Sequence, residues 1–276
     1  QTEMNAIGGW QNMFLAKYNS SGNLIWVKNA GGETGWIEAT AVSTLPDGSS
    51  EVTGEFIGET VLGQNEPQIH LNTTDADSSD IFIIKYDPMG QPVWAVSAGG
   101  NESDTSTGIT TNTDGSILVT GHFAGTAIFG AGTGMENSVV SAGGKDIFLA
   151  KYDENGQLLW VKRAGGTTND ESSAIVRVTD NQTVIAGYYT GSARFTSNGT
   201  TIPIVLNSAG GKDIFVAMFT RLGEVSWVKS AGGTLDEEAL SLASLKKNRE
   251  SKVAIGGYFS SSNIAFGDVG EVQTLP

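Results

Sequence analysis

Short segments in which apolar and polar residues alternate recur along the whole chain. Turn-forming residues bound each segment, and an alternation of period two is typical of a β-strand with one buried face. No long stretch carries an apolar stripe at helical spacing. The pattern therefore predicts an all-β protein with many short antiparallel strands and almost no helix.

One pattern of twenty residues occurs four times without a gap. Its third copy reads IFLAKYDENGQLLWVKRAGG, and every copy contains one tryptophan, at spacings of 68, 66 and 67 residues. The tryptophans are Trp26, Trp94, Trp160 and Trp227. A fixed period of this length indicates a repeat architecture.

A second predicted hairpin follows the Gly-Gly pair of each copy, so that each period holds four antiparallel strands. One such sheet cannot bury both of its faces, but sheets that repeat radially bury their faces against one another. We therefore predict a single β-propeller domain over residues 1–276. Its four repeats lie at approximately 8–75, 76–141, 142–208 and 209–276.

Aromatic residues at fixed repeat positions are expected to fill the wedges between sheets. The tryptophans form one such set. A second set lies two residues after a recurring glycine and consists of Phe56, Phe123, Tyr189 and Phe259.

The chain begins with an outer strand pair and finishes with an inner pair. We expect residues 253–259 to pair beside residues 13–27, so that both termini build one blade and close a four-bladed ring without open edges. The alternative is that the four repeats are part of a larger propeller, completed by another chain or by further sequence.

The repeat resembles the bacterial propeller repeat often called SBBP, which occurs in secreted and surface proteins of Bacteroidetes and other bacteria. The resemblance rests on DIFLAKYDENGQLLWVKRAGG at 146–166 and on VTGHFAGTAIFG at 119–130, and it covers nearly the whole chain. It implies a propeller fold, and it brings no shared catalytic motif.

Composition narrows the range of partners. Thirty acidic and sixteen basic residues give a net charge of −14, which disfavours nucleic acid as a partner. No apolar run is long enough to span a bilayer, and the absence of cysteine excludes disulfides and thiolate chemistry. A chain that begins at Gln1 is compatible with removal of a leader, so we expect export to the cell surface or to the periplasmic face of the outer membrane.

Two groups of residues are candidates for ligand or partner contact. One repeat position carries a different side chain in each repeat, which is typical of either a variable strand position or a ligand-contacting ring: Glu55, His122, Tyr188 and Tyr258. The loops after the Gly-Gly pairs are acidic, and they offer either a negative face for a basic partner or ordinary solvated turns. Their candidate residues are Asp104, Asp170, Glu171 and Asp236.

Asp75, Asp77 and Asp80 stand within six residues and suggest a Ca²⁺ site, the only cofactor that the sequence offers. The competing interpretation is structural. Asp80 has the same repeat position as Asp146 and Asp213, and each of these carboxylates would cap the turn before a strand.

The leading functional hypothesis is a non-enzymatic scaffold that binds another protein in the bacterial envelope. The second is carbohydrate binding, with exposed Trp10 and Trp36 stacking on sugars. The third is a glycoside hydrolase that uses acidic loops. Only two histidines exist and no catalytic motif accompanies them, so we predict no catalytic residue.

Overall fold

The computed structural model describes residues 3–63, 68–196, 203–247, 250–267 and 273–275 of the chain. Within these ranges the regular structure is strand throughout, and the strands pair in antiparallel ladders. None of these residues forms a helix long and apolar enough to cross a membrane. The prediction of an all-β protein is confirmed.

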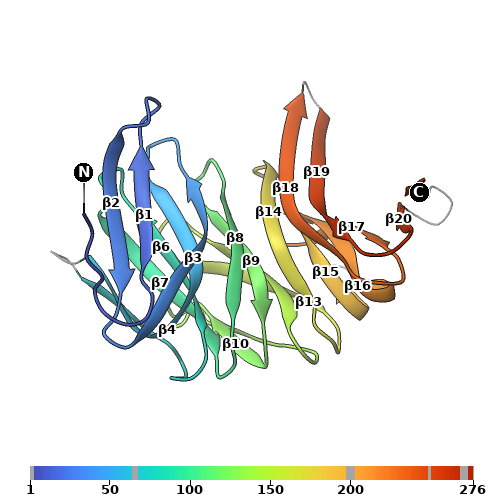
Figure 1. Ribbon diagram of the computed structural model, residues 1–276, viewed down its shortest axis with the longest axis horizontal. Helices are drawn as coiled ribbons and strands as arrows, with labels where there is room; N and C mark the ends of the chain where they lie inside the picture. The colour runs from blue at the N-terminus through green and yellow to red at the C-terminus, as the bar shows by residue number, and fades with distance from the viewer. Residues whose placement is uncertain (1–2, 64–67, 197–202, 248–249, 268–272, 276) are drawn as a thin grey trace.

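Three four-stranded sheets follow one another along the chain, and we call them blades I, II and III (Figure 1). In each blade an inner hairpin is laddered to an outer hairpin. Blade I contains β3 (Gly35–Thr44), β4 (Ser50–Leu62), β6 (Asp80–Tyr86) and β7 (Pro92–Gly100). Blade II contains β8 (Thr105–Thr111), β9 (Ile117–Phe123), β12 (Asp146–Tyr152) and β13 (Leu158–Gly165). Blade III contains β14 (Glu171–Thr179), β15 (Gln182–Phe195), β16 (Ile204–Thr220) and β17 (Val225–Gly232).

A half-blade stands at each end of this series. The N-terminal half-blade is an outer pair, β1 (Met13–Tyr18) and β2 (Leu24–Gly31). The C-terminal half-blade is an inner pair, β18 (Glu237–Lys247) and β19 (Glu250–Phe259). The first inner strands β3, β8, β14 and β18 contact one another in sequence, as sheets stacked around an axis require.

The two half-blades lie at opposite ends of an arc (Figure 1). Among the described strands, β1 is laddered only to β2 and β19 only to β18. The predicted pairing of residues 253–259 beside residues 13–27 is therefore wrong for this structure. The three blades turn the chain through only part of a circle, so its two free edges do not meet.

Small hairpins connect each blade to the one before it. In the first hairpin, the end of β4 pairs with β5 (Ile69–Asn72) on one side and with β2 on the other. In the second, β10 (Thr126–Phe129) pairs with β11 (Asn137–Val140) and with β7. In the third, the end of β15 pairs with the start of β16 and with β13. In the fourth, β20 (Ile264–Phe266) pairs with β21 (Gln273–Leu275) and with β17. Backbone hydrogen bonds thus continue from blade to blade.

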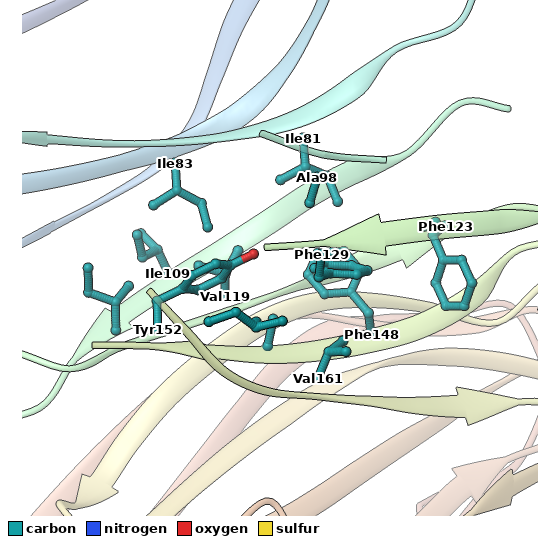
Figure 2. Packing of buried hydrophobic residues seen from close by; sticks show 14 residues of the cluster. Ile81, Ile83, Ala98, Ile109, Val119, Phe123, Phe129, Phe148, Tyr152 and Val161 are labelled. Atoms are coloured by element: carbon teal, nitrogen blue, oxygen red, sulfur yellow. The ribbon is translucent and has the colours of Figure 1, made fainter. Parts of the chain in front are cut away.

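The hydrophobic core lies between successive blades rather than in one centre. Figure 2 shows Ile81 and Ile83 of blade I facing Phe148 and Tyr152 of blade II, and the Phe129 and Phe148 rings are 5.1 Å apart. Phe56, Phe123 and Tyr189 are fully buried as predicted. Phe259 is instead 51% exposed, because the C-terminal half-blade lacks the outer strands that complete the other blades.

The tryptophans join neighbouring blades at their outer turns. The indole N–H of Trp26 donates to Pro88 O at 3.0 Å, that of Trp94 to Glu154 O at 3.0 Å, and that of Trp160 to Arg221 O at 3.3 Å. The rings cover Gly90, Gly156 and Gly223, which have positive φ and leave no room for a Cβ. Trp26, Trp94 and Trp160 therefore lie between blades as predicted, but they are half-buried rather than central.

Candidate functional site

Polar residues from two blades meet at each blade junction, and we call each group a rim cluster. The register pairs Glu38 with Glu55, Thr105 with His122, Glu171 with Tyr188, and Glu238 with Tyr258. A third position is the residue directly before Asn12, Asp80, Asp146 or Asp213. It contributes Gln11, Ser79, Lys145 and Lys212. Because these three positions recur, each junction offers a variant of one arrangement.

The rim cluster between blades I and II consists of neutral donors around one carboxylate. Glu55 Oε2 accepts from Ser79 Oγ at 3.0 Å and from Thr105 Oγ1 at 2.8 Å. Glu55 is half-buried, and Thr105 belongs to the following blade. The carboxylate thus connects two blades at the rim.

The rim cluster between blades II and III contains the buried histidine. Glu171 lies 3.2 Å from Lys145 Nζ and 3.4 Å from His122 Nδ1. Burial lowers the pKa of His122 to about 4, although the Glu171 charge acts to raise it. The imidazole is therefore neutral at pH 7. Burial acts to raise the pKa of Glu171, but His122, Tyr188 and Lys145 outweigh it and the net shift is downward. Lys145 is the cation that balances this carboxylate.

The rim cluster between blade III and the C-terminal half-blade contains two aromatic rings. Lys212 Nζ lies 3.7 Å from the centre of the Tyr188 ring and 3.2 Å from Glu238 Oε2. Tyr258 OH donates to the same carboxylate at 3.2 Å. Tyr188 is buried and Tyr258 is exposed.

The rim cluster at the first junction is incomplete. Gln11 Nε2 donates to Glu38 Oε2 at 2.9 Å, and both side chains are exposed. The position held elsewhere by Glu55, His122 or Tyr188 belongs to a second inner strand, and the N-terminal half-blade has none. The residues of the predicted ring therefore belong to successive clusters, and ion pairs and hydrogen bonds within the chain hold their side chains.

A pair of buried carboxylates adjoins the rim cluster at three junctions. Asp104 accepts from Gly100 N at 2.8 Å and Ala124 N at 3.1 Å, while Asp80 accepts from Thr74 N at 2.7 Å. Both carboxylates lie against Gly99, where a Cβ would clash with Asp80 Oδ1 and would lie 2.9 Å from Asp104 Oδ2. The glycine is required because the carboxylates occupy the space of a side chain.

The same arrangement recurs at the next two junctions as Asp146 with Asp170 and as Asp213 with Glu237. Burial and the neighbouring Asp80 charge raise the pKa of Asp104 to about 8, and burial with the Asp146 charge raises that of Asp170 to about 7. Burial also raises the pKa of Asp80, Asp146 and Asp213. At the first junction Asn12 and Ile37 hold these two positions, so that pair carries no charge.

These contacts correct part of the sequence analysis. Asp104 and Asp170 are fully buried and bonded to backbone N–H groups, so they do not contribute to an acidic surface. Asp236 is exposed and accepts from Lys212 N at 3.0 Å. The buried carboxylate of its loop is Glu237, which the sequence analysis missed. Its position five residues after the first glycine of the Gly-Gly pair, shared with Asp104 and Asp170, was the available signal.

The capping role of the recurrent aspartate is confirmed. Asp146 accepts from Ala142 N at 2.9 Å and Asp213 from Ala209 N at 3.0 Å, as Asp80 does from Thr74. Asp75 Oδ1 accepts from Asp77 N. Among the described residues, no three acidic or histidine side chains converge as a metal ion would need. The calcium site stays a prediction to which the structure brings no set of donors.

Trp10 and Trp36 adjoin the incomplete rim cluster. The Trp10 side chain is 89% exposed, while the backbone N–H of Trp10 donates to Gly35 O at 2.9 Å and a β-bridge joins Gln11 to Trp36. Trp36 is half-buried. One of the two tryptophans is therefore fully presented to solvent beside Gln11 and Glu38.

Comparison with known proteins yields two distant relatives. The chain is 23% identical to an uncharacterized WD repeat-containing protein, L264, of Acanthamoeba polyphaga mimivirus, in an alignment of 293 positions that covers 90% of the chain. It is 27% identical to the regulatory protein FlaEY of Caulobacter vibrioides, in an alignment of 282 positions that covers 97% of the chain. It covers 21% and 28% of these proteins, about a quarter of their length. No protein-family model matches the chain.

The name of the first relative includes WD repeats, which agrees with a repeat protein of the propeller type. Neither relative is named as an enzyme. No link to the SBBP repeat or to Bacteroidetes emerges from the comparisons, so that resemblance still rests on the residues quoted for it.

Proposed function

We propose that the chain is a non-enzymatic propeller module that binds another protein through its rim, within an exported bacterial protein at the cell surface or in an outer-membrane assembly. The observation that carries the proposal is Trp10, an aromatic side chain 89% exposed beside the polar pair Gln11 and Glu38. A large exposed aromatic surrounded by polar groups has the composition of an interface hot spot.

The arrangement of acidic residues favours binding over hydrolysis. A glycosidase needs two carboxylates that reach the substrate. Asp104 and Asp170, which the acidic loops offered for that role, are instead buried and bonded to the backbone. The names of the two relatives are consistent with a repeat or regulatory protein.

The test is capture of a partner from a bacterial surface and outer-membrane fraction by the immobilised chain. We expect one abundant protein to be retained at physiological salt and to be lost with Trp10→Ala. Leu222→Ala is the matched control, because Leu222 is also highly exposed but lies on an outer turn of blade III. Equal retention by all three proteins, or no retained protein, would refute the proposal.

Carbohydrate binding is the second candidate, and the same exposed indole favours it because sugars stack on aromatic rings. Titration of surface polysaccharides, followed by Trp fluorescence, separates the two. A response that Trp10→Ala abolishes, without any captured protein, would replace the first proposal by the second.

A further inference from the structure

The two half-blades are complementary parts of one blade. In blades I to III the second inner strand joins the first outer strand in one register, with Phe56 opposite Asp80, Phe123 opposite Asp146 and Tyr189 opposite Asp213. Applied to the chain ends, the same register places Phe259 opposite Asn12 and Val253 opposite Tyr18. The alignment needs no insertion on either strand.

Side chains at the two free edges are exposed where their equivalents are buried. Phe14 is 65% exposed and Tyr18 is 61% exposed on β1. The equivalent residues of the complete blades are all buried: Phe82, Phe148, Phe215, Tyr86, Tyr152 and Phe219. In blade I the rings of Phe56 and Phe82 form an edge contact at 6.5 Å, and the corresponding pair at the ends is Phe259 and Phe14.

The outer turn of the N-terminal half-blade also lacks its cover. Gly90, Gly156 and Gly223 each lie under the tryptophan of the preceding blade, whereas a Cβ at Gly22 would meet nothing within 4 Å. Trp227 is the equivalent tryptophan at the other end. Among the described residues it has no turn carbonyl to which its indole N–H donates, unlike Trp94 or Trp160.

A groove runs along the free edge of β1 and across β3. Its volume is about 330 Å³, and Phe14, Tyr18 and Val42 are among its lining residues. Val42 is exposed, but its equivalent Ile109 is buried between blades I and II. In blades II and III, the corresponding space is filled by the inner hairpin of the preceding blade.

We propose that a second copy of the chain fills this groove head to tail, so that β19 of one copy adds to β1 of the next and the two chains complete one four-stranded blade. Strand addition at an open edge supplies backbone hydrogen bonds, and the register fixes which side chains meet. Trp227 of the first copy then covers the Gly22 turn of the second, and Tyr258 reaches the incomplete Gln11–Glu38 cluster.

A second copy fits better than the chain's own other end, because the two half-blades of one chain stand at opposite ends of the arc (Figure 1). The contact uses different surfaces on the two partners, so each added copy presents a new free edge until a ring closes. The inference goes beyond the proposed protein-binding role and does not depend on it.

Two blocking variants test the head-to-tail contact. Phe14→Asp places a charge at the β1 edge and Phe259→Asp at the β19 edge, and both positions are exposed in the single chain. We expect the unmodified chain to sediment as assemblies, each variant alone as a monomer, and their mixture as a one-to-one pair, because only one functional contact remains. A self-complementary two-fold contact would not be restored by mixing.

Cysteine pairing tests the register. The chain contains no cysteine, and the register places Lys17 opposite Ala254. Under mild oxidation, Lys17→Cys in one chain and Ala254→Cys in another should form a disulfide-linked pair. Lys17→Cys with Ser260→Cys is the control, since six residues along a strand separate those positions by about 20 Å.

Three results would overturn the inference. The first is an unmodified chain that stays monomeric at concentrations up to about 100 μM, and the second is a mixture of Phe14→Asp and Phe259→Asp chains that stays monomeric. The third is a Lys17→Cys, Ala254→Cys chain whose disulfide forms only within one chain. Assembly without capture of an envelope protein would refute the proposed function alone. Capture by a strictly monomeric chain would refute this inference alone.

Discussion

Blade II and the N-terminal half-blade contain nearly the same outer hairpin but have different surroundings. IFLAKYDENGQLLWVKRA in blade II and MFLAKYNSSGNLIWVKNA in the half-blade fold into the same paired strands. Phe148 is fully buried in the first and its equivalent Phe14 is 65% exposed in the second. The local sequence thus forms the hairpin, whereas burial depends on whether a preceding blade and an inner strand pair are present.

The largest expected difference between these regions is the cost of truncating the shared phenylalanine. Phe148→Ala removes a ring packed between two blades and should lower the free energy of unfolding by about 3–5 kcal/mol. Phe14→Ala should change it by less than about 0.5 kcal/mol. Urea unfolding followed by Trp fluorescence, at a dilution where the chain is monomeric, measures both. Equal costs would show that the free edge is already covered in the single chain.

A smaller effect is expected from the buried carboxylates that separate the complete junctions from the first one. Asp80→Asn copies Asn12, and its amide nitrogen can donate toward Asp104 from the place of the unbonded Asp80 Oδ1. Folding raises the pKa of Asp80 and, to about 8, that of Asp104, so the stability that protonation contributes is lost as the pH rises toward 8. We expect Asp80→Asn to be more stable than the unmodified chain at pH 8.5 by about 1–2 kcal/mol, with a flatter pH dependence between pH 5 and 8.5.

The control for this change is Asp77→Asn, which alters an exposed carboxylate in the same loop. Its stability should follow that of the unmodified chain at every pH. If Asp80→Asn retained the full loss of stability between pH 5 and 8.5, the carboxylate pair would not be its source.

The smallest expected effect concerns the tryptophans that join blades. Trp94→Phe loses the hydrogen bond to Glu154 O and should cost about 1 kcal/mol. Trp227→Phe should cost almost nothing in the monomeric chain, because the described residues give its indole no equivalent turn. Thermal unfolding of the two variants side by side measures this difference, and an equal loss in both would contradict it.

The repeat itself accounts for how much could be predicted. Alternation and turn residues predicted the paired strands. The recurrence of the Asp at position 146 predicted that it caps the turn before a strand, and the structure identifies Ala142 N as the donor. Acidic loops, by contrast, were interpreted as surface. The sequence does not show that Asp104 and Asp170 turn inward toward backbone N–H groups, because loop composition carries no information about which oxygen finds an internal donor.

The rim clusters show the same limit. His122, Tyr188 and Tyr258 were assigned correctly to one repeat position. The sequence did not show, however, that His122 lies against Glu171 and that Lys212 lies against Glu238, contacts that cross from one blade to the next. Only the stacking of one blade on the next brings these groups together.

Period-two alternation and turn chemistry act over a few residues, so the printed residues were enough to predict the strands, their antiparallel pairing within each hairpin and the division into equivalent repeats. Whether the ends meet is known only from the arrangement of the blades, because closure depends on small rotations between blades that add up around the arc and that no local pattern encodes. The same arrangement sets which of the repeated aromatic and acidic side chains are buried, because their burial depends on the neighbouring blade.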